Sequence, residues 1–423
     1  MTDTLKEPFF GDAEKPYQQG DIVAMHQLTP EESRLDPENT PRAVWSVEVS
    51  DPYVDRYSRE DQKRILEEET AANHAASLRR MNGLWERKPG TAYFDAEGNP
   101  ADKGRIWGDP VSTAKFFNAH GLALHVWQKM IPAPEALLYI SDPVSFPTVQ
   151  TRPLKDGLPI TVPTDHLIGI WHALCTDGRA IRSRATIMSK LGRDFVESTQ
   201  EAASLGIGEG LPDEIHWFSA GCGTTLPTVQ GAIASGIQER LTIHLADKDT
   251  YSMLSTAEVV RKQLGFSGKV RTNEVDIFNL NELKALKAKM DEEGTRPMIV
   301  DAMGVFEYTG SRLTVDSSEF LAALYDILAP GGRLLIGQMR SDRPNPDFTL
   351  GVVAWPYIEL RNPNEFMAVV RDAGIPPDRA ELFLPTDGVN SILAIDKPRA
   401  HEINLAASSY VLQLPHALFD NMI

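Results

Sequence analysis

The chain is poor in cysteine and has no long apolar run, and both shortages exclude classes of protein. Cys175 and Cys222 are the only cysteines in 423 residues, and two lone thiols form neither a disulfide framework nor a cysteine-based zinc site. No run of about 18 apolar residues is present that would form a transmembrane helix. The polar, acidic N-terminus MTDTLKEPFFGDAEKPYQQGD lacks the apolar core of a signal peptide. We therefore expect a cytoplasmic protein with no metal site and no membrane partner.

Basic residues are also in short supply. The chain has 42 Lys and Arg against 59 Asp and Glu, a net charge of −17, and no Lys/Arg block. A surface that follows nucleic-acid phosphates needs clustered positive charge, so no nucleic-acid partner is expected. What is present is an ordinary globular composition, 42% hydrophobic and 24% charged, over a length that exceeds one domain of about 100–200 residues.

The N-terminal half is predicted to be mainly helical. Residues 1–58 are rich in Pro, Asp and Glu and are expected to form an extended arm, with one strand-like run at Ala43–Val49. Unbroken helix formers and recurring apolar positions predict helices over 59–87, 112–130 and 164–205, the last interrupted near Gly178. We expect residues 59–205 to form a lid that supplies substrate contacts.

The C-terminal half has a different pattern. From residue 206 to about 400, apolar runs of strand length alternate with helical stretches: IHWFSA, LTIHLA, KVRTNEV, MIVDAM, RLLIGQM and SILAID. This alternation predicts an α/β domain with a mostly parallel sheet and helices on both faces. Ligands in such sheets bind at the carboxyl ends of the strands. Residues 401–423 are expected to be a C-terminal extension.

Several strand ends carry residues suited to a ligand. The first strand runs into Gly221–Cys222–Gly223 and a helix, and glycine lets a backbone approach a ligand closely. The second ends at Asp247, where a carboxylate can accept hydrogen bonds from ribose hydroxyls; Asp249 in the same turn is the alternative. Asp276 and Ile277 follow the third strand, and Asp301 ends the fourth. A last element is the turn in LAPGGRLLIG, residues 328–337.

Together these elements resemble the class I S-adenosylmethionine-dependent methyltransferases over residues 206–397. The resemblance implies a Rossmann-like, seven-stranded sheet with an antiparallel final hairpin, and S-adenosyl-L-methionine as cofactor. It places Gly221 and Gly223 under the methionine moiety, Asp247 at the ribose, and Asp276 with the backbone of Ile277 at the adenine.

Two positions depart from the family pattern. The acid that normally precedes the first glycine by two residues is Ser219, and the third glycine is Thr225. Either other groups hold the amine of the cofactor, or cofactor binding is weakened. A looser similarity, in GVFEYTG and WPYIELRNPNEF, is to methyltransferases that form methyl esters of hydroxy fatty acids.

The candidate catalytic residues follow the fourth strand. Methyl transfer is an in-line displacement that needs alignment and desolvation, and a hydroxyl or amine acceptor also needs a base. We choose Glu307 and Tyr308, with Asp301 as a further base candidate over the same cleft. Arg182 and Arg184 could reach an anionic substrate or the cofactor carboxylate, but we expect them on a solvated helix face. No histidine is chosen, and the candidate pocket-lining tryptophans are Trp107, Trp127, Trp171 and Trp355.

The predicted activity is methyl transfer to oxygen or nitrogen of a small molecule, with a carboxylate or a hydroxyl as candidate acceptor groups. A nicotinamide-dependent oxidoreductase shares the glycine turn and the strand-end acid, but it predicts a glycine near Thr225 and does not explain the Pro-Gly-Gly turn. A non-catalytic binding protein on a degenerate methyltransferase fold is the second alternative. The acceptor and the oligomeric state, including a homodimer, stay open.

Overall fold

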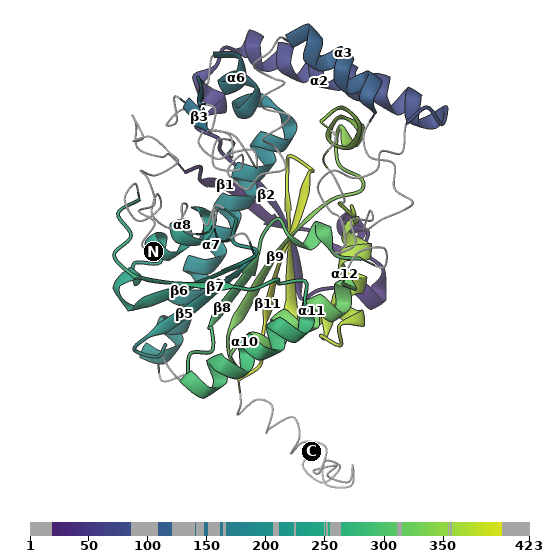
Figure 1. The fold of residues 1–423 in the computed structure, drawn as a ribbon. Coiled ribbons are helices and arrows are strands. Elements are labelled where there is room, and N and C mark those ends of the chain that lie inside the picture. Colours follow the sequence, from purple (N-terminus) through teal and green to yellow (C-terminus); the bar gives the residue numbers. More distant parts are fainter. Residues whose placement is uncertain are drawn as a thin grey trace.

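A large sheet with a helical cap above it dominates the fold (Figure 1). The computed structural model describes residues 19–85, 109–120, 140, 148–150, 161–163, 166–205, 211–223, 226–248, 250, 253, 264–310, 315–353, 355 and 358–399. None of the helices in these ranges is long and apolar enough to cross a bilayer. The predicted C-terminal extension lies outside them.

The sheet has the strand order of a doubly wound fold. Five strands are parallel neighbours in the order β7-β6-β5-β8-β9, which is the order 3-2-1-4-5 of Rossmann-like sheets. Next to β9 lies the antiparallel β11, followed by β10. The predicted fold class and the final hairpin are therefore confirmed. The bounds are β5 (Ile215–Ala220), β6 (Leu241–Asp247), β7 (Lys269–Glu274), β8 (Ile299–Ala302), β9 (Arg333–Met339), β10 (Ala380–Pro385) and β11 (Asn390–Asp396).

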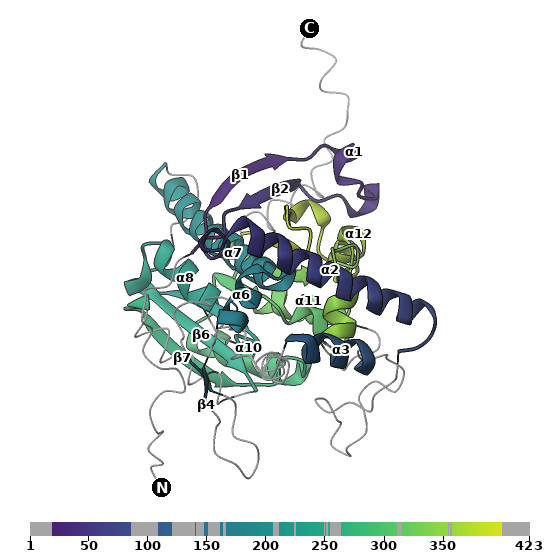
Figure 2. The same cartoon turned by 90° about the horizontal axis from the view of Figure 1, so that it is seen from above.

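The predicted count of seven strands is wrong, because the N-terminal arm adds two. Strand β2 (Ala43–Val49), the run singled out in the sequence, pairs in parallel with β10, and β1 (Ile22–Gln27) pairs antiparallel with β2. The physical reason is that β10 would otherwise leave an unpaired edge of backbone N–H and C=O groups. Figure 2 shows these two strands on the opposite side of the molecule from β6 and β7. Two further strands, β3 (Thr148–Gln150) and β4 (Thr161–Pro163), form a separate antiparallel pair.

Side chains of alternating direction build a core on each face of the sheet. Trp217 on β5 packs between helices on one face, while Phe218 belongs to the core on the other. A Cβ atom at Gly192 would lie 2.5 Å, and one at Gly231 2.7 Å, from Cη2 of Trp217, so these two glycines make room for the indole. The first face carries α7 (Thr176–Ser204) and α8 (Leu226–Ala234). The second carries α10 (Leu280–Glu293), α11 (Ser317–Ile327) and α12 (Pro363–Asp372).

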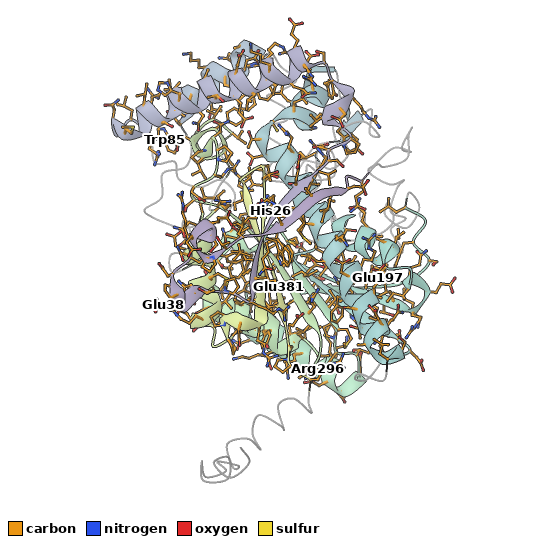
Figure 3. All side chains as sticks on the ribbon, turned by 180° about the vertical axis from the view of Figure 1, so that it is seen from behind. His26, Glu38, Trp85, Glu197, Arg296 and Glu381 are labelled. Atoms are coloured by element: carbon orange, nitrogen blue, oxygen red, sulfur yellow. The ribbon has the colours of Figure 1, made fainter. Side chains whose placement is uncertain are left out.

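The cap has a hydrophobic core of its own. It contains α2 (Arg59–Met81), α3 (Pro110–His120), α6 (His166–Leu174) and the π-helical turn η5 (Phe348–Val352). Phe348 stacks on Trp171 with ring centroids 6.1 Å apart. Trp85 lies at the end of α2 (Figure 3), where its indole donates to the carbonyl of Ala76 at 2.9 Å. The segment between β9 and α12 thus completes a cap made mostly by the N-terminal half.

The predicted helices are present with shifted ends. Helix α2 begins at Arg59 as predicted but ends at Met81 instead of residue 87, and α3 covers the described part of the predicted 112–130. The break in the third helix is at Cys175 rather than near Gly178, because the Cys175 thiol caps α7 by accepting from Gly178 N at 3.3 Å. Helix α7 packs directly on the sheet. The helices that stand above the sheet are α2, α3 and α6.

Candidate functional site

A glycine turn lies at the carboxyl end of β5. Gly221 and Gly223 have φ of +60° and +48°, a region that L side chains rarely adopt. A Cβ atom at Gly221 would collide with the side chains of Val305 and Ile277. The loops that follow β5, β7 and β8 therefore meet at Gly221. Between the glycines, Cys222 is buried, and burial raises the pKa of its thiol.

The carboxylate of Asp247 lies beside this turn. Asp247 ends β6, which pairs with β5, and its Oδ2 accepts a hydrogen bond from Gly223 N at 3.4 Å. The side chain is half-buried. Asp247 therefore ends its strand, as the sequence predicts, and lies beside the glycine turn. The alternative, Asp249, lies outside the described residues.

Asp276 and Ile277 follow β7, the next strand. Asp276 Oδ1 accepts from Phe278 N at 3.1 Å, and Lys248 donates to Oδ2 at 3.4 Å. Ile277 is buried and its side chain reaches the space above Gly221. The three loops after β5, β6 and β7 thus bring two carboxylates and an apolar side chain to one edge of the sheet.

Asp301 lies below the turn, in the core on the α7/α8 face. Its carboxylate is 2% exposed and accepts from Trp217 Nε1 at 2.7 Å, Ser219 Oγ at 2.9 Å and Thr228 Oγ1 at 3.1 Å. Burial raises the pKa of Asp301 to about 6, and the three donors oppose that shift. These contacts hold the Asp301 carboxylate inside the protein. It lies 2.9 Å from the hydroxyl of Ser219, the residue that departs from the family pattern.

Glu307 and Tyr308 form the turn η4 (Phe306–Tyr308) just after β8. Glu307 is 1% exposed, and its Oε1 accepts from Met339 N at 3.1 Å. Burial raises the pKa of its carboxyl group, and the nearby cation of Arg184 acts in the opposite direction. The hydroxyl of Tyr308 accepts from Trp355 Nε1 at 2.8 Å. The two candidate catalytic residues therefore lie at the carboxyl end of β8, next to the glycine turn.

The prediction that Arg182 and Arg184 are solvated is wrong, because helix α7 presents both to the protein interior. Arg182 donates to the Asp51 carboxylate and to the carbonyls of Ile140 and His172. Arg184 is 6% exposed and lies 3.6 Å from Glu307.

The sequence analysis missed Thr228 and Arg361 as parts of this region, and it placed Arg184 on a solvated face in preference to the site. One signal that could have pointed to Arg184 is Gly337 in the middle of strand β9, because a strand glycine often marks a close approach. Of the tryptophans proposed to line a pocket, Trp171 is in the cap core and Trp355 contacts Tyr308. Trp107 and Trp127 lie outside the described residues.

No family model and no curated protein matches the chain. Among solved structures, it is similar to an O-methyltransferase family protein from Burkholderia thailandensis at 20% identity, covering 53% of this chain and 63% of that chain, with a TM-score of 0.34. The chain thus spans less than two thirds of that relative. A second is the citrinin polyketide synthase CMeT domain, at 14% identity over 79% and 97% of the two chains, with a TM-score of 0.36. A third is magnesium protoporphyrin IX methyltransferase from Synechocystis with bound SAH, at 11% identity over 51% and 87%, with a TM-score of 0.33. The fold assignment rests on the strand order described above.

Proposed function

We propose that the protein binds S-adenosyl-L-methionine over the Gly221–Gly223 turn and transfers its methyl group to a small-molecule acceptor. The observation that carries the proposal is the meeting of three strand-end loops at Gly221, a position that a Cβ atom would fill. Asp247, on the neighbouring strand, is suited to accept from the ribose hydroxyls. Asp276 and the backbone of Ile277 are suited to the adenine.

When bound, the cofactor supplies a methyl group on a positively charged sulfur. The protein then has to align the acceptor and exclude water. Buried Glu307 and half-buried Tyr308, at the end of β8, are the residues proposed to contact the acceptor. The loop that holds them also carries Val305, whose side chain lies against Gly221.

The strand order favours this function over nicotinamide-dependent oxidation. In the dinucleotide-binding order, a sixth strand continues the sheet beyond the fifth. Here the antiparallel β11 takes that place beside β9. This hairpin and the Pro-Gly-Gly turn before β9 are both features of the methyltransferase resemblance.

A non-catalytic binding protein is the second candidate, because Ser219 replaces the acid of the family pattern. Ser219 donates to the Asp301 carboxylate at 2.9 Å, but that carboxylate is buried in the α7/α8 core and does not take the place of the missing acid. Binding of the cofactor without turnover of any acceptor would favour this candidate.

Thermal unfolding with added ligands tests the proposed cofactor. A ligand at 100 times its dissociation constant adds about 2.7 kcal/mol to the free energy of unfolding. We expect S-adenosylhomocysteine to raise the melting temperature accordingly and NADH to leave it unchanged. A shift with NADH and none with S-adenosylhomocysteine would overturn the proposal.

A further inference from the structure

Arg184 reaches the carboxyl end of the sheet through a channel lined by two glycines. Its side chain crosses β9 at Gly337, where a Cβ atom would lie 3.0 Å from Arg184 Cδ. It ends at Gly304, in the loop after β8, where a Cβ atom would lie 2.8 Å from Nη2. A larger residue at either position would crowd the arginine. The two glycines therefore hold the guanidinium beside the loop that follows β8.

Arg184 and Glu307 face each other, and each has a polar atom without a partner. Nη1 of Arg184 lies 3.6 Å from Oε1 of Glu307, which is too long for a hydrogen bond. Among the described residues, neither Nη1 of Arg184 nor Oε2 of Glu307 has a hydrogen-bond partner, although both atoms are buried. Because unpaired buried atoms are costly, they mark a place where a ligand can provide the missing hydrogen bonds.

The second arginine near Glu307 is already engaged. Arg361 donates through Nη1 to Gln338 Oε1 at 2.8 Å, and through Nη2 to Thr309 O and Ser317 Oγ at 2.6 Å. These bonds tie it to the strand ends and leave it no free role beside Glu307. Arg184 is thus the arginine whose charge is available to a ligand here.

The pair lies at the end of a row of strand-end residues that make up the proposed cofactor site. Asp276 follows β7, Asp247 ends β6 and Gly221 follows β5, and these three strands are neighbours in that order. Strand β8 is the next neighbour beyond β5. Its loop carries Val305, which lies against Gly221, and Glu307 two residues later. With the adenine at β7 and the ribose at β6, the amino-acid end of the cofactor extends from β5 toward β8.

We infer that Arg184 and Glu307 bind the amino-acid end of S-adenosyl-L-methionine, with Arg184 at the carboxylate and Glu307 at the ammonium group. This inference rests on the proposed function. The carboxylate accepts from Nη1 and the ammonium group donates to Oε2, so a single α-carbon provides partners for both unpaired atoms. An arginine is permanently charged, and its planar N–H groups match the geometry of a carboxylate.

This assignment accounts for the departure at Ser219. In the family pattern, an acid at that position orients the amine of the cofactor, whereas here Glu307 supplies a carboxylate from the loop after β8. Burial raises the pKa of Glu307, and both Arg184 and an incoming ammonium group favour its ionised form. A zwitterion adds no net charge to the buried pair. An ionised carboxylate oxygen has two acceptor sites, so Glu307 remains able to contact the methyl acceptor as proposed above.

Calorimetric titration of the full chain with four nucleosides tests the inference. S-adenosylhomocysteine carries the whole amino acid, and methylthioadenosine carries none of it. Two further analogues of S-adenosylhomocysteine lack either the carboxylate or the ammonium group. We expect S-adenosylhomocysteine to bind about tenfold or more tightly than each of the other three. Equal affinity for S-adenosylhomocysteine and methylthioadenosine would overturn the inference.

Arg184→Met separates the carboxylate contact from a purely structural role. Its affinity for S-adenosylhomocysteine should fall about tenfold or more, while the analogue without the carboxylate should bind within about threefold of the parent. Arg179→Met, which replaces an exposed arginine of the same helix, should leave both affinities unchanged. Arg184→Lys keeps the charge and should show a smaller loss with the same selectivity, so the test stands even if Arg184→Met does not fold. An equal loss for both ligands would overturn the inference.

Glu307→Gln tests the ammonium contact. The amide has the same shape and keeps an oxygen that accepts from Met339 N, but it has no negative charge. Its affinity for S-adenosylhomocysteine should fall about tenfold or more, while the analogue without the ammonium group should bind within about threefold of the parent. Unchanged affinity for S-adenosylhomocysteine in this variant or in Arg184→Met would overturn the inference. If neither S-adenosylhomocysteine nor methylthioadenosine binds to the parent, it is the proposed function that fails.

Discussion

At the scale of single residues, the sequence places the acids but not the directions of their side chains. Asp301 was expected over the cleft because it ends a strand. In the sheet it pairs with Ser219 and shares its face with Ile299, so it points into the α7/α8 core. Direction in a strand depends on which face each alternate residue meets, and that requires the neighbouring strands to be known.

Asp301→Asn should change how stability depends on pH. The folded pKa of about 6 lies above the reference value of 3.8, so the folded protein binds this proton more tightly than the unfolded chain does. That contribution to stability is present below pH 3.8 and is lost as pH rises through 6. From the usual linkage relation, the parent should lose about 2.4 kcal/mol relative to Asp301→Asn between pH 4 and pH 7.

Urea unfolding of both proteins over this pH range measures the difference. Because all other groups titrate in both proteins, their contributions cancel. Parallel stability curves for the parent and Asp301→Asn would show that the carboxyl group has an ordinary pKa.

At the scale of elements, the sequence predicts features that have a local signal, such as the start of a helix, but not contacts between distant segments. The start of helix α2 was predicted correctly from its unbroken run of helix formers, and in the structure the Ser58 hydroxyl caps it by accepting from Asp61 N at 3.1 Å. The cap core was not foreseen, since it joins Trp171 to Phe348 from the opposite end of the chain. The burial of Arg184 on α7 was missed for a similar reason, because an arginine is usually exposed and only the packed sheet shows that Arg184 is not.

Phe348→Ala should loosen the cap more than the sheet. Phe348 is fully buried against Phe116 and Trp171, and removing such a ring costs about 3–5 kcal/mol. Hydrogen exchange should show faster exchange in α2, α3 and α6 and little change in β5, β6 and β8. Phe320→Ala, in α11 on the far face of the sheet, is the matched control. Equal loss of protection in both variants would mean that the cap is not a separate unit.

At the scale of the whole molecule, the alternation of strands and helices was enough to predict the parallel strands and their helices. The antiparallel hairpin followed from the family resemblance. The arm was harder, because the pairing of β2 with β10 joins opposite ends of the chain and has no local signal. The residues of the candidate site divide in the same way, into those that a local sequence pattern predicts and those that depend on contacts between distant segments. Strand-end residues such as Asp247 were predictable, whereas the Arg184–Glu307 pair depends on how α7 lies on the sheet.

The central claim is that S-adenosyl-L-methionine binds over the glycine turn with Asp247 at its ribose. Calorimetric titration of S-adenosylhomocysteine into the parent protein and Asp247→Ala tests it most directly. We expect a single site per chain in the parent and a loss of about tenfold or more in the variant, because hydrogen bonds to a charged acceptor contribute about 1.5–3 kcal/mol each. Unchanged affinity in Asp247→Ala, or no binding to the parent while NADH does bind, would contradict the account.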